Sequence, residues 1–256
     1  MIAHRFDLAV AGGVEARVIF TDRGVAASGG SSRWPYAWAN LGSHVGDDPS
    51  AVVAARSALA GALGVPASGL TFMHPDHGRG VALVGAPTGV APGMELRDVD
   101  ALVTDRPGIG LVALAADCVP VILVEPQASV VAAVHCGWRG LVLDVVGAAL
   151  AAIEEHGGRA GAVQAVLGPA ICGRCYPVPP QRAAEVAEVW PEAVTEAVDG
   201  QPAVDVRAGL VARLAEAGAH CALVGGCTAE DARYYSHRRD GTTGRQAGAV
   251  VLVEAA

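Results

Sequence analysis

The segment LVALAADCVPVILVEPQASVVAAVHCGWRG, residues 111–140, consists of three apolar runs separated by short polar or proline-containing breaks. The runs are rich in valine, leucine, isoleucine and alanine, which is typical of buried strands. We therefore predict three strands, at Leu111–Ala115, Val121–Val124 and Val130–Val134. Pro126 and Gln127 separate the second run from the third and indicate a turn.

The last two strands are expected to pair as an antiparallel hairpin. If the turn is centred between Pro126 and Gln127, Cys118 lies opposite His135, and opposed Cβ atoms are about 4.5–5.5 Å apart. Zn–S and Zn–N bonds of about 2.3 and 2.0 Å would then let both side chains reach one ion. A bulge or an odd-length loop would change this register. Cys136 is expected to point to the opposite face, since strand side chains alternate.

Helix signals occur both before this segment and at its end. Asp47 and Asp48 are expected to cap a helix that runs through Leu63 and stops at Gly64. A long amphipathic helix is expected from Arg139 to His156, before Gly157-Gly158. The remaining expected elements are strands at Ala16–Phe20, Val81–Val84, Ala101–Thr104, Val163–Leu167, Ala222–Val224 and Ala249–Val253, and helices at Pro180–Trp190 and Val206–Ala217.

The order of these elements predicts an α/β fold. Strands first cluster and then alternate with helices, which indicates mixed α/β layers rather than a simple doubly wound sheet. The 256 residues show no internal repeat or linker, and 52% of them are apolar, enough for a substantial core. We therefore expect a single domain over residues 1–256.

Charge and hydropathy exclude several classes of protein. A net charge of −8 argues against a nucleic-acid partner, which requires a basic surface, although a local pocket can still bind an anion. The apolar runs are shorter than the roughly 20 residues that span a bilayer. Met1–Leu8 shows no signal peptide, so we expect a cytoplasmic location and no membrane partner.

The chain contains six cysteines, Cys118, Cys136, Cys172, Cys175, Cys221 and Cys227. In a cytoplasmic protein they are expected to be thiols or metal ligands rather than disulfides. Cys172-Gly173-Arg174-Cys175 is a C-x-x-C motif, but no second such motif and no thioredoxin-like context accompany it. We interpret it as structural packing, with redox sensitivity as the alternative.

Several motifs resemble one known family. His135-Cys136-Gly137-Trp138-Arg139-Gly140 is similar to the H-x-G-W-R-G signature of the YfiH-like family, also called laccase-domain or multicopper polyphenol oxidase proteins. Matches to other family motifs cover nearly the whole chain: Asn40-Leu41-Gly42 with His44-Val45-Gly46-Asp47, Ala116-Asp117-Cys118-Val119-Pro120, Gly168-Pro169-Ala170-Ile171 with Cys175-Tyr176-Pro177-Val178, and Tyr235-Ser236-His237-Arg238-Arg239-Asp240 with Thr243-Gly244-Arg245. The resemblance implies a mixed-sheet α-β-β-α layered sandwich, similar to that of cysteine deamidases.

The resemblance also implies a metal site. Its ligands map to Cys118, His135 and His77, which keeps the family's H-G-x-x-V frame, although Pro75 stands where the family has glutamine. His74 is the alternative third ligand. Three ligands leave a position open, as in catalytic sites, for Zn²⁺ or alternatively Cu²⁺. Asp117 is expected either to orient a ligand through a hydrogen bond or to cap the strand end.

The activity implied by the resemblance is phosphorolysis of adenosine, inosine and methylthioadenosine to a free base and a ribose 1-phosphate, together with adenosine deamination. The expected partners are thus a purine nucleoside and phosphate, on a monomer or small homo-oligomer. Arginine suits phosphate because its planar fork pairs with two oxygens. The candidate phosphate ligands are Arg23, Arg139, Arg238 and Arg239, although the last two could instead lie in a solvated turn.

Three other functions stay open. Cys118 as nucleophile and His135 as base would suit a cysteine-dependent amide hydrolase. Some family members are described as peptidoglycan-editing factors, which fits the same Cys118 and His135 chemistry. A second is non-catalytic, namely a metal-stabilised binding protein that acts in envelope biogenesis. A polyphenol oxidase with copper is the third, but one His-Cys-His set provides few ligands for a multicopper cluster.

Overall fold

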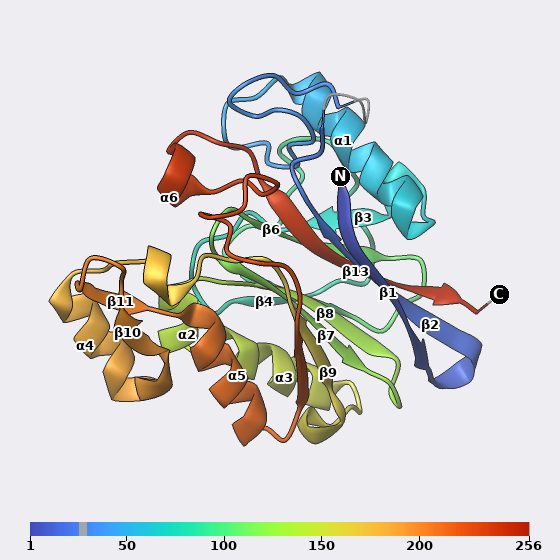
Figure 1. Ribbon diagram of the computed structural model, residues 1–256. Coiled ribbons are helices and arrows are strands. Elements are labelled where there is room, and N and C mark those ends of the chain that lie inside the picture. Colours follow the sequence, from blue (N-terminus) through green and yellow to red (C-terminus); the bar gives the residue numbers. More distant parts are fainter. Residues whose placement is uncertain (26–29, 256) are drawn as a thin grey trace.

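Buried apolar runs form two large β-sheets that pack against each other, with helices on both outer faces (Figure 1). The computed structural model describes residues 1–25 and 30–255. The strands are β1 Ile2–Val10, β2 Val14–Thr21, β3 Leu70–Phe72, β4 Val81–Leu83, β5 Ala101–Thr104, β6 Gly110–Ala115, β7 Val119–Glu125, β8 Val130–Cys136, β9 Gln164–Leu167, β10 Val194–Glu196, β11 Pro202–Val204, β12 His220–Leu223 and β13 Gln246–Glu254. The α-helices are α1 Pro49–Leu63, α2 Trp138–Val142, α3 Val145–Glu155, α4 Pro180–Val189, α5 Val206–Glu216 and α6 His237–Asp240.

Both large sheets mix parallel and antiparallel pairs. The first has the order β1-β2-β13-β6-β3 and the second the order β12-β9-β7-β8-β5-β4, while β10 and β11 form a small separate hairpin. The pairs β3–β6, β4–β5 and β9–β12 are parallel. Since both sheets contain antiparallel pairs, among them β1–β2 and β7–β8, this is not a doubly wound fold.

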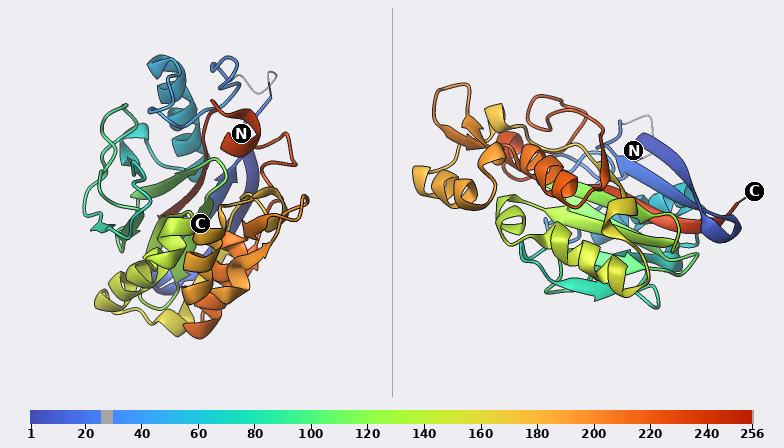
Figure 2. Two further views of the ribbon diagram at one scale, coloured as in Figure 1. Left: turned by 90° about the vertical axis from the view of Figure 1, so that its left-hand side faces the viewer. Right: turned by 90° about the horizontal axis from the view of Figure 1, so that it is seen from below.

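Three apolar clusters fill the spaces between neighbouring layers. One lies between the two sheets and includes Phe20, Leu111 and Ile122. A second joins the six-stranded sheet to the helices α2 to α5, and a third joins the five-stranded sheet to α1. Figures 1 and 2 show α1 on one side of the sheets and α3 with α5 on the other. The expected α-β-β-α layering is therefore confirmed.

Two of the three signals expected at the ends of α1, Asp48 and Gly64, act as predicted. The carboxylate of Asp48 accepts the backbone N–H of Ser50, and Gly64 ends the helix at a φ of 82°. Asp47 does not cap the helix with Asp48: its carboxylate accepts the side-chain amide of Asn40 and the backbone N–H of Asp48. The loop before α1 is thus connected to the Asn40 motif.

The register predicted for the β7–β8 hairpin is wrong by two residues. Pro120, not Cys118, lies opposite His135, because the turn occupies residues 126–129. The carboxylate of Glu125 accepts the backbone N–H of Ala128 inside this turn, and Ser129 adopts a φ of 54°. Because strand side chains alternate with a period of two, a shift of two residues leaves each side chain on the face of the hairpin where it was expected.

The long helix predicted over residues 139–156 is two helices. Asp144 has a φ of 58°, and its side chain caps the second helix by accepting the N–H of Gly147. Arg213 of α5 forms an ion pair with the Asp144 carboxylate, with Nε 2.7 Å from Oδ1. This tertiary contact helps to fix the kink, which apolar periodicity does not indicate.

Most predicted elements lie close to their expected ranges, but the short elements β3, β10, β11 and α6 and the long strand β1 were not predicted. Strand β1 forms a sheet edge, and its sequence alternates exposed or half-exposed charged residues with apolar ones. Over the described ranges, none of the helices is long and apolar enough to cross a membrane.

Candidate active site

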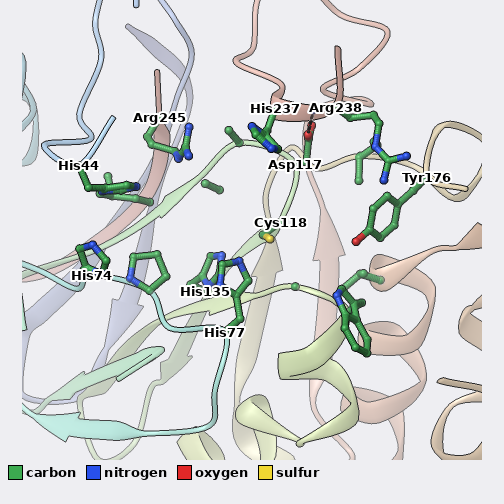
Figure 3. A pocket seen from close by; sticks show the side chains of 18 residues that line it. His44, His74, His77, Asp117, Cys118, His135, Tyr176, His237, Arg238 and Arg245 are labelled. Atoms are coloured by element: carbon green, nitrogen blue, oxygen red, sulfur yellow. Dashed lines mark hydrogen bonds between the residues drawn. The ribbon is translucent and has the colours of Figure 1, made fainter. Parts of the chain in front are cut away.

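A pocket of about 440 Å³ opens at the junction of β6, β7 and β8. Segments far apart in the sequence converge on it (Figure 3). Its lining consists of His44, His74, Pro75, His77, Leu114, Ala115, Ala116, Asp117, Cys118, His135, Gly137, Trp138, Ile171, Tyr176, Val206, His237, Arg238 and Arg245.

Three potential metal ligands lie together on one side of the pocket. One ring nitrogen each of His77 and His135 and the sulfur of Cys118 all lie within 4.8 Å of one another. The two imidazole rings are nearly perpendicular, with centroids 4.8 Å apart. Two nitrogens and one sulfur at this separation suit Zn²⁺ or a copper ion and leave a position open.

Asp100 positions two of these three residues. It is fully buried, and its Oδ1 lies 2.8 Å from Nδ1 of His135. The same carboxylate accepts the backbone N–H groups of His77 and Gly78 at 3.0 and 2.7 Å. These hydrogen bonds lower the pKa of the carboxyl despite its burial, so it is ionised and only accepts. Nδ1 of His135 therefore carries a proton, and Nε2 is the nitrogen available to a metal.

Glycine is required where β8 leads into α2. A Cβ on Gly137 would lie 2.9 Å from the sulfur of Cys118 and 3.3 Å from Cδ2 of His77. Both distances are shorter than normal Cβ contacts, so a side chain would push the ligands apart. Cys136, one residue earlier, points into the apolar core as expected.

Cys118 and His135 shift each other's pKa. Burial raises the pKa of the Cys118 thiol, but the charge and hydrogen bond of His135 outweigh it, with a smaller effect from His77, and lower it to about 6. Burial lowers the pKa of His135, and the Cys118 charge and the Asp100 hydrogen bond together raise it to about 9. Without a metal, the pair is thus a thiolate and an imidazolium at neutral pH.

Comparison with known proteins identifies the family. The family model described as multi-copper polyphenol oxidoreductase laccase matches residues 17–253. The chain belongs to this family. It is 48% identical over 234 residues to a purine nucleoside phosphorylase of Streptomyces coelicolor, covering 91% of this chain and 94% of the relative. It is 35% identical over 201 residues to an adenosine deaminase of an unknown prokaryotic organism, covering 74% and 75%.

Two crystal structures have the same fold as this laccase-family chain. The hypothetical protein YfiH of Bacillus licheniformis superposes with a TM-score of 0.85 at 27% identity, and 92% of each chain is covered. YlmD of Geobacillus stearothermophilus gives a TM-score of 0.84 at 30% identity, with 95% of this chain and 93% of the other covered. Together with the named relatives, these matches establish the chain as an enzyme of the laccase-like family.

The aspartate next to Cys118 has contacts of its own. Oδ1 of Asp117 accepts the hydroxyl of Thr228 at 2.6 Å, and Oδ2 accepts the backbone N–H of Arg238 at 2.7 Å. The ring N–H of His135 is held by Asp100 instead. Asp117 thus connects the β6–β7 turn to the C-terminal loops that form the opposite wall of the pocket.

The four arginines expected at the phosphate site are in different environments. Arg238 lines the pocket, with its guanidinium 4.9 Å from the centre of the Tyr176 ring. The pocket lining does not include the other three. Arg23 donates to the carbonyl of Ala37, and Arg139 is exposed on α2. Arg239 pairs with Asp240, as in the turn considered as its alternative.

Arg245 lines the pocket but was not among the predicted site residues. Its backbone N–H donates to Oδ1 of Asn40, so the Asn40-Leu41-Gly42 motif helps to position it. Nη1 donates to the carbonyls of Thr243 and Gly244, whereas Nε and Nη2 have no partner among the described residues. Arg245 belongs to a motif noted in the sequence, but only the fold shows that it lies beside the pocket.

His74, the alternative third ligand, and Asp100, which was not predicted, have different places in the site. His74 lies in the same pocket, its ring 5.0 Å from that of His44, but the three-ligand group contains His77. Asp100 was missed as a site residue. The available signal was an acidic residue directly before the buried strand at Ala101–Thr104.

Proposed function

We propose that this laccase-family enzyme acts on purine nucleosides, cleaving adenosine, inosine and methylthioadenosine with phosphate to give the base and a (methylthio)ribose 1-phosphate. The names of several relatives, among them the Streptomyces coelicolor protein, support this class of substrate. The pocket volume of about 440 Å³ lies within the range of roughly 300–1,000 Å³ typical of small-molecule sites.

One observation carries the proposal: a single pocket contains both a His-Cys-His ligand group and arginine N–H groups that have no other partner among the described residues. His77, Cys118 and His135 lie on one side, and Arg245 and Arg238 line the other parts of the wall (Figure 3). A nucleoside with phosphate beside it needs both a polar centre at the sugar and an anion site.

The three ligands would hold Zn²⁺, or alternatively Cu²⁺, which would supply a fixed positive charge and Lewis acidity at its open position. The chain's own contribution is orientation. Asp100 keeps the proton on Nδ1 of His135, so that Nε2 stays available. The same carboxylate fixes the backbone at His77 through two N–H bonds.

The arginines are proposed to bind phosphate. Nε and Nη2 of Arg245 are free to form a fork with two oxygens, and Arg238 adds a second cation. During phosphorolysis, a phosphate oxygen bonds to C1′ while the C1′–N9 bond breaks, and the released base takes up a proton. Tyr176 and Trp138 provide aromatic surface against which a purine can stack.

Incubation of the purified enzyme with adenosine, with and without phosphate, tests this proposal. Phosphorolysis predicts adenine and ribose 1-phosphate only when phosphate is present. Inosine formed at the same rate in both samples would support deamination, the second candidate, which the relative named adenosine deaminase favours. Inosine alone, without any adenine, would overturn the phosphorylase assignment.

A third candidate is a cysteine-dependent amide hydrolase. The thiolate–imidazolium pair of Cys118 and His135 favours it, because such a pair activates a nucleophilic cysteine. Metal analysis separates it from the proposal. A protein that purifies without metal, has no activity on nucleosides and forms a covalent adduct at Cys118 with amide substrates would be a hydrolase.

A further inference from the structure

A second group of potential metal ligands lies outside the pocket. The sulfurs of Cys172, Cys175 and Cys227 and a carboxylate oxygen of Glu230 all lie within 4.8 Å of one another. None of these four residues lines the pocket. Cys227 is buried, Cys172 and Cys175 are half-buried, and Glu230 is exposed, so an ion can enter from solvent.

The fold brings two distant segments together at this group. Ala170 and Cys227 form a parallel bridge, and the N–H of Thr228 donates to the carbonyl of Ala170. The 3₁₀ turn Gly173–Cys175 then places Cys175 on the same side as Cys172. Local backbone pairing therefore fixes the separation between Cys227 and the Cys172–Cys175 turn, which are far apart in sequence.

The contacts within the group resemble those of a metal–thiolate site. The backbone N–H of Cys172 lies 3.3 Å from the sulfur of Cys227, as expected for N–H groups that stabilise thiolates. The sulfur of Cys175 lies 3.4 Å from Oε1 of Glu230. Ligands around tetrahedral Zn²⁺, with Zn–S of about 2.3 Å, are separated by roughly 3.8 Å, so only small shifts are needed.

Simple packing does not explain this arrangement well. Packing cysteines are usually surrounded by apolar side chains, whereas here three thiols face each other and a carboxylate. Soft thiolate ligands favour Zn²⁺ or Cu(I) over hard cations such as Mg²⁺. Four protein ligands complete a tetrahedral shell, which is the pattern of structural rather than catalytic zinc.

We propose that Cys172, Cys175, Cys227 and Glu230 form a second, structural Zn²⁺ site. The ion would connect the segment after β9 to the segment after β12. Both segments continue directly into the pocket wall, because Tyr176 follows Cys175 and Thr228 bonds to Asp117. Its loss is therefore expected to loosen the wall that carries Tyr176 without removing any ligand of the pocket metal.

Zinc content measured on the purified full chain tests this site independently of nucleoside activity. The proposal predicts two Zn²⁺ per chain in the wild type and one in Cys118→Ala, which removes only the pocket site. Cys172→Ser/Cys227→Ser should also retain one. The matched control is Cys221→Ser, which removes an exposed thiol outside both groups and should leave two.

A spectroscopic readout tests these ligands. Co²⁺ bound to Cys118→Ala should give strong thiolate-to-metal charge-transfer absorption, and Glu230→Gln in this background should lower the Co²⁺ affinity by about tenfold or more. No zinc and no such absorption in folded Cys118→Ala would overturn the proposal. A mass deficit of two hydrogens, which marks a disulfide among these cysteines, would overturn it as well.

Discussion

The carboxylate of Asp100 lies 2.8 Å from Nδ1 of His135 and, through two backbone N–H bonds, also fixes the turn at His77. One buried side chain thus orients two of the three potential metal ligands. His77 has a φ of 57°, so its backbone depends on such tertiary support. The precision of the site therefore depends on a residue outside the recognised motifs.

Asp100→Asn should weaken metal binding by about 10–100-fold, because an amide can present its NH₂ to Nδ1 and is a weaker acceptor for the N–H groups. Zinc affinity measured by chelator competition checks this. Asp98→Asn is the matched control, since Asp98 is exposed and asparagine tolerates its φ of 59°. Equal affinities for both variants would contradict the role assigned to Asp100.

Gly137→Ala should reduce zinc affinity by about tenfold or more, because the new methyl group would lie 2.9 Å from the Cys118 sulfur. Chelator competition and a melting curve should be measured together. Gly61→Ala in α1 serves as control, since a Cβ there meets nothing within 4 Å and the residue lies outside both ligand groups. A Gly137→Ala protein with normal zinc affinity would show that the ligands tolerate the added group.

Arg245→Lys should raise the KM for phosphate by about 10–100-fold, because lysine keeps the charge but cannot form a two-pronged contact. Steady-state kinetics at varied phosphate check this. Arg139→Lys, at an exposed arginine outside the pocket lining, should leave the KM unchanged. If Arg139→Lys has the larger effect, phosphate binds elsewhere.

The sequence allowed correct prediction of features that depend on local chemistry. Asp48 and Gly64 mark both ends of α1, and buried apolar runs mark the central strands. The hairpin register was wrong because the turn conformation depends on Glu125 and on the φ of Ser129. The break between α2 and α3 depends on Arg213, which is distant in sequence.

The same distinction applies to the site. Cys118, His135 and His77 lie in motifs, and the structure brings them together. Asp100 and Arg245 act through side-chain directions that no periodicity specifies. Only the tertiary structure therefore shows which arginines line the pocket and which have other partners.

A buried ion pair between Arg56 and Glu95 should make stability depend on pH. Arg56 is fully buried, and its Nη2 lies 2.7 Å from Oε1 of Glu95. Burial raises the pKa of Glu95, but hydrogen bonds from Ser43 and Arg56 outweigh it and lower it to about 2. Because the folded pKa lies below the unfolded one, near 4.5, this contribution of about 3 kcal/mol is present above pH 4.5 and lost as the pH falls towards 2.

Urea unfolding of the wild type and of Glu95→Gln over this pH range checks the Glu95 prediction. The wild type should lose stability between about pH 4.5 and 2, and the variant should start less stable and change less there. Parallel curves for the two proteins would mean that other carboxyl groups dominate acid unfolding.

The last prediction concerns the reactivity of Cys118 in protein stripped of metal. Its pKa of about 6 makes it a thiolate at neutral pH, whereas burial raises the pKa of Cys136 and Cys221. Iodoacetamide should therefore alkylate Cys118 first, with a rate that rises as the pH increases through about 6, as peptide mass spectrometry can follow. His135→Ala should move this midpoint upward, since the imidazolium is the main cause of the low value.

Added Zn²⁺ should protect Cys118 in the wild type but not in a His77→Ala/His135→Ala protein, because one remaining ligand holds zinc too weakly. Protection that persists in the double variant would mean that the metal does not bind at this group.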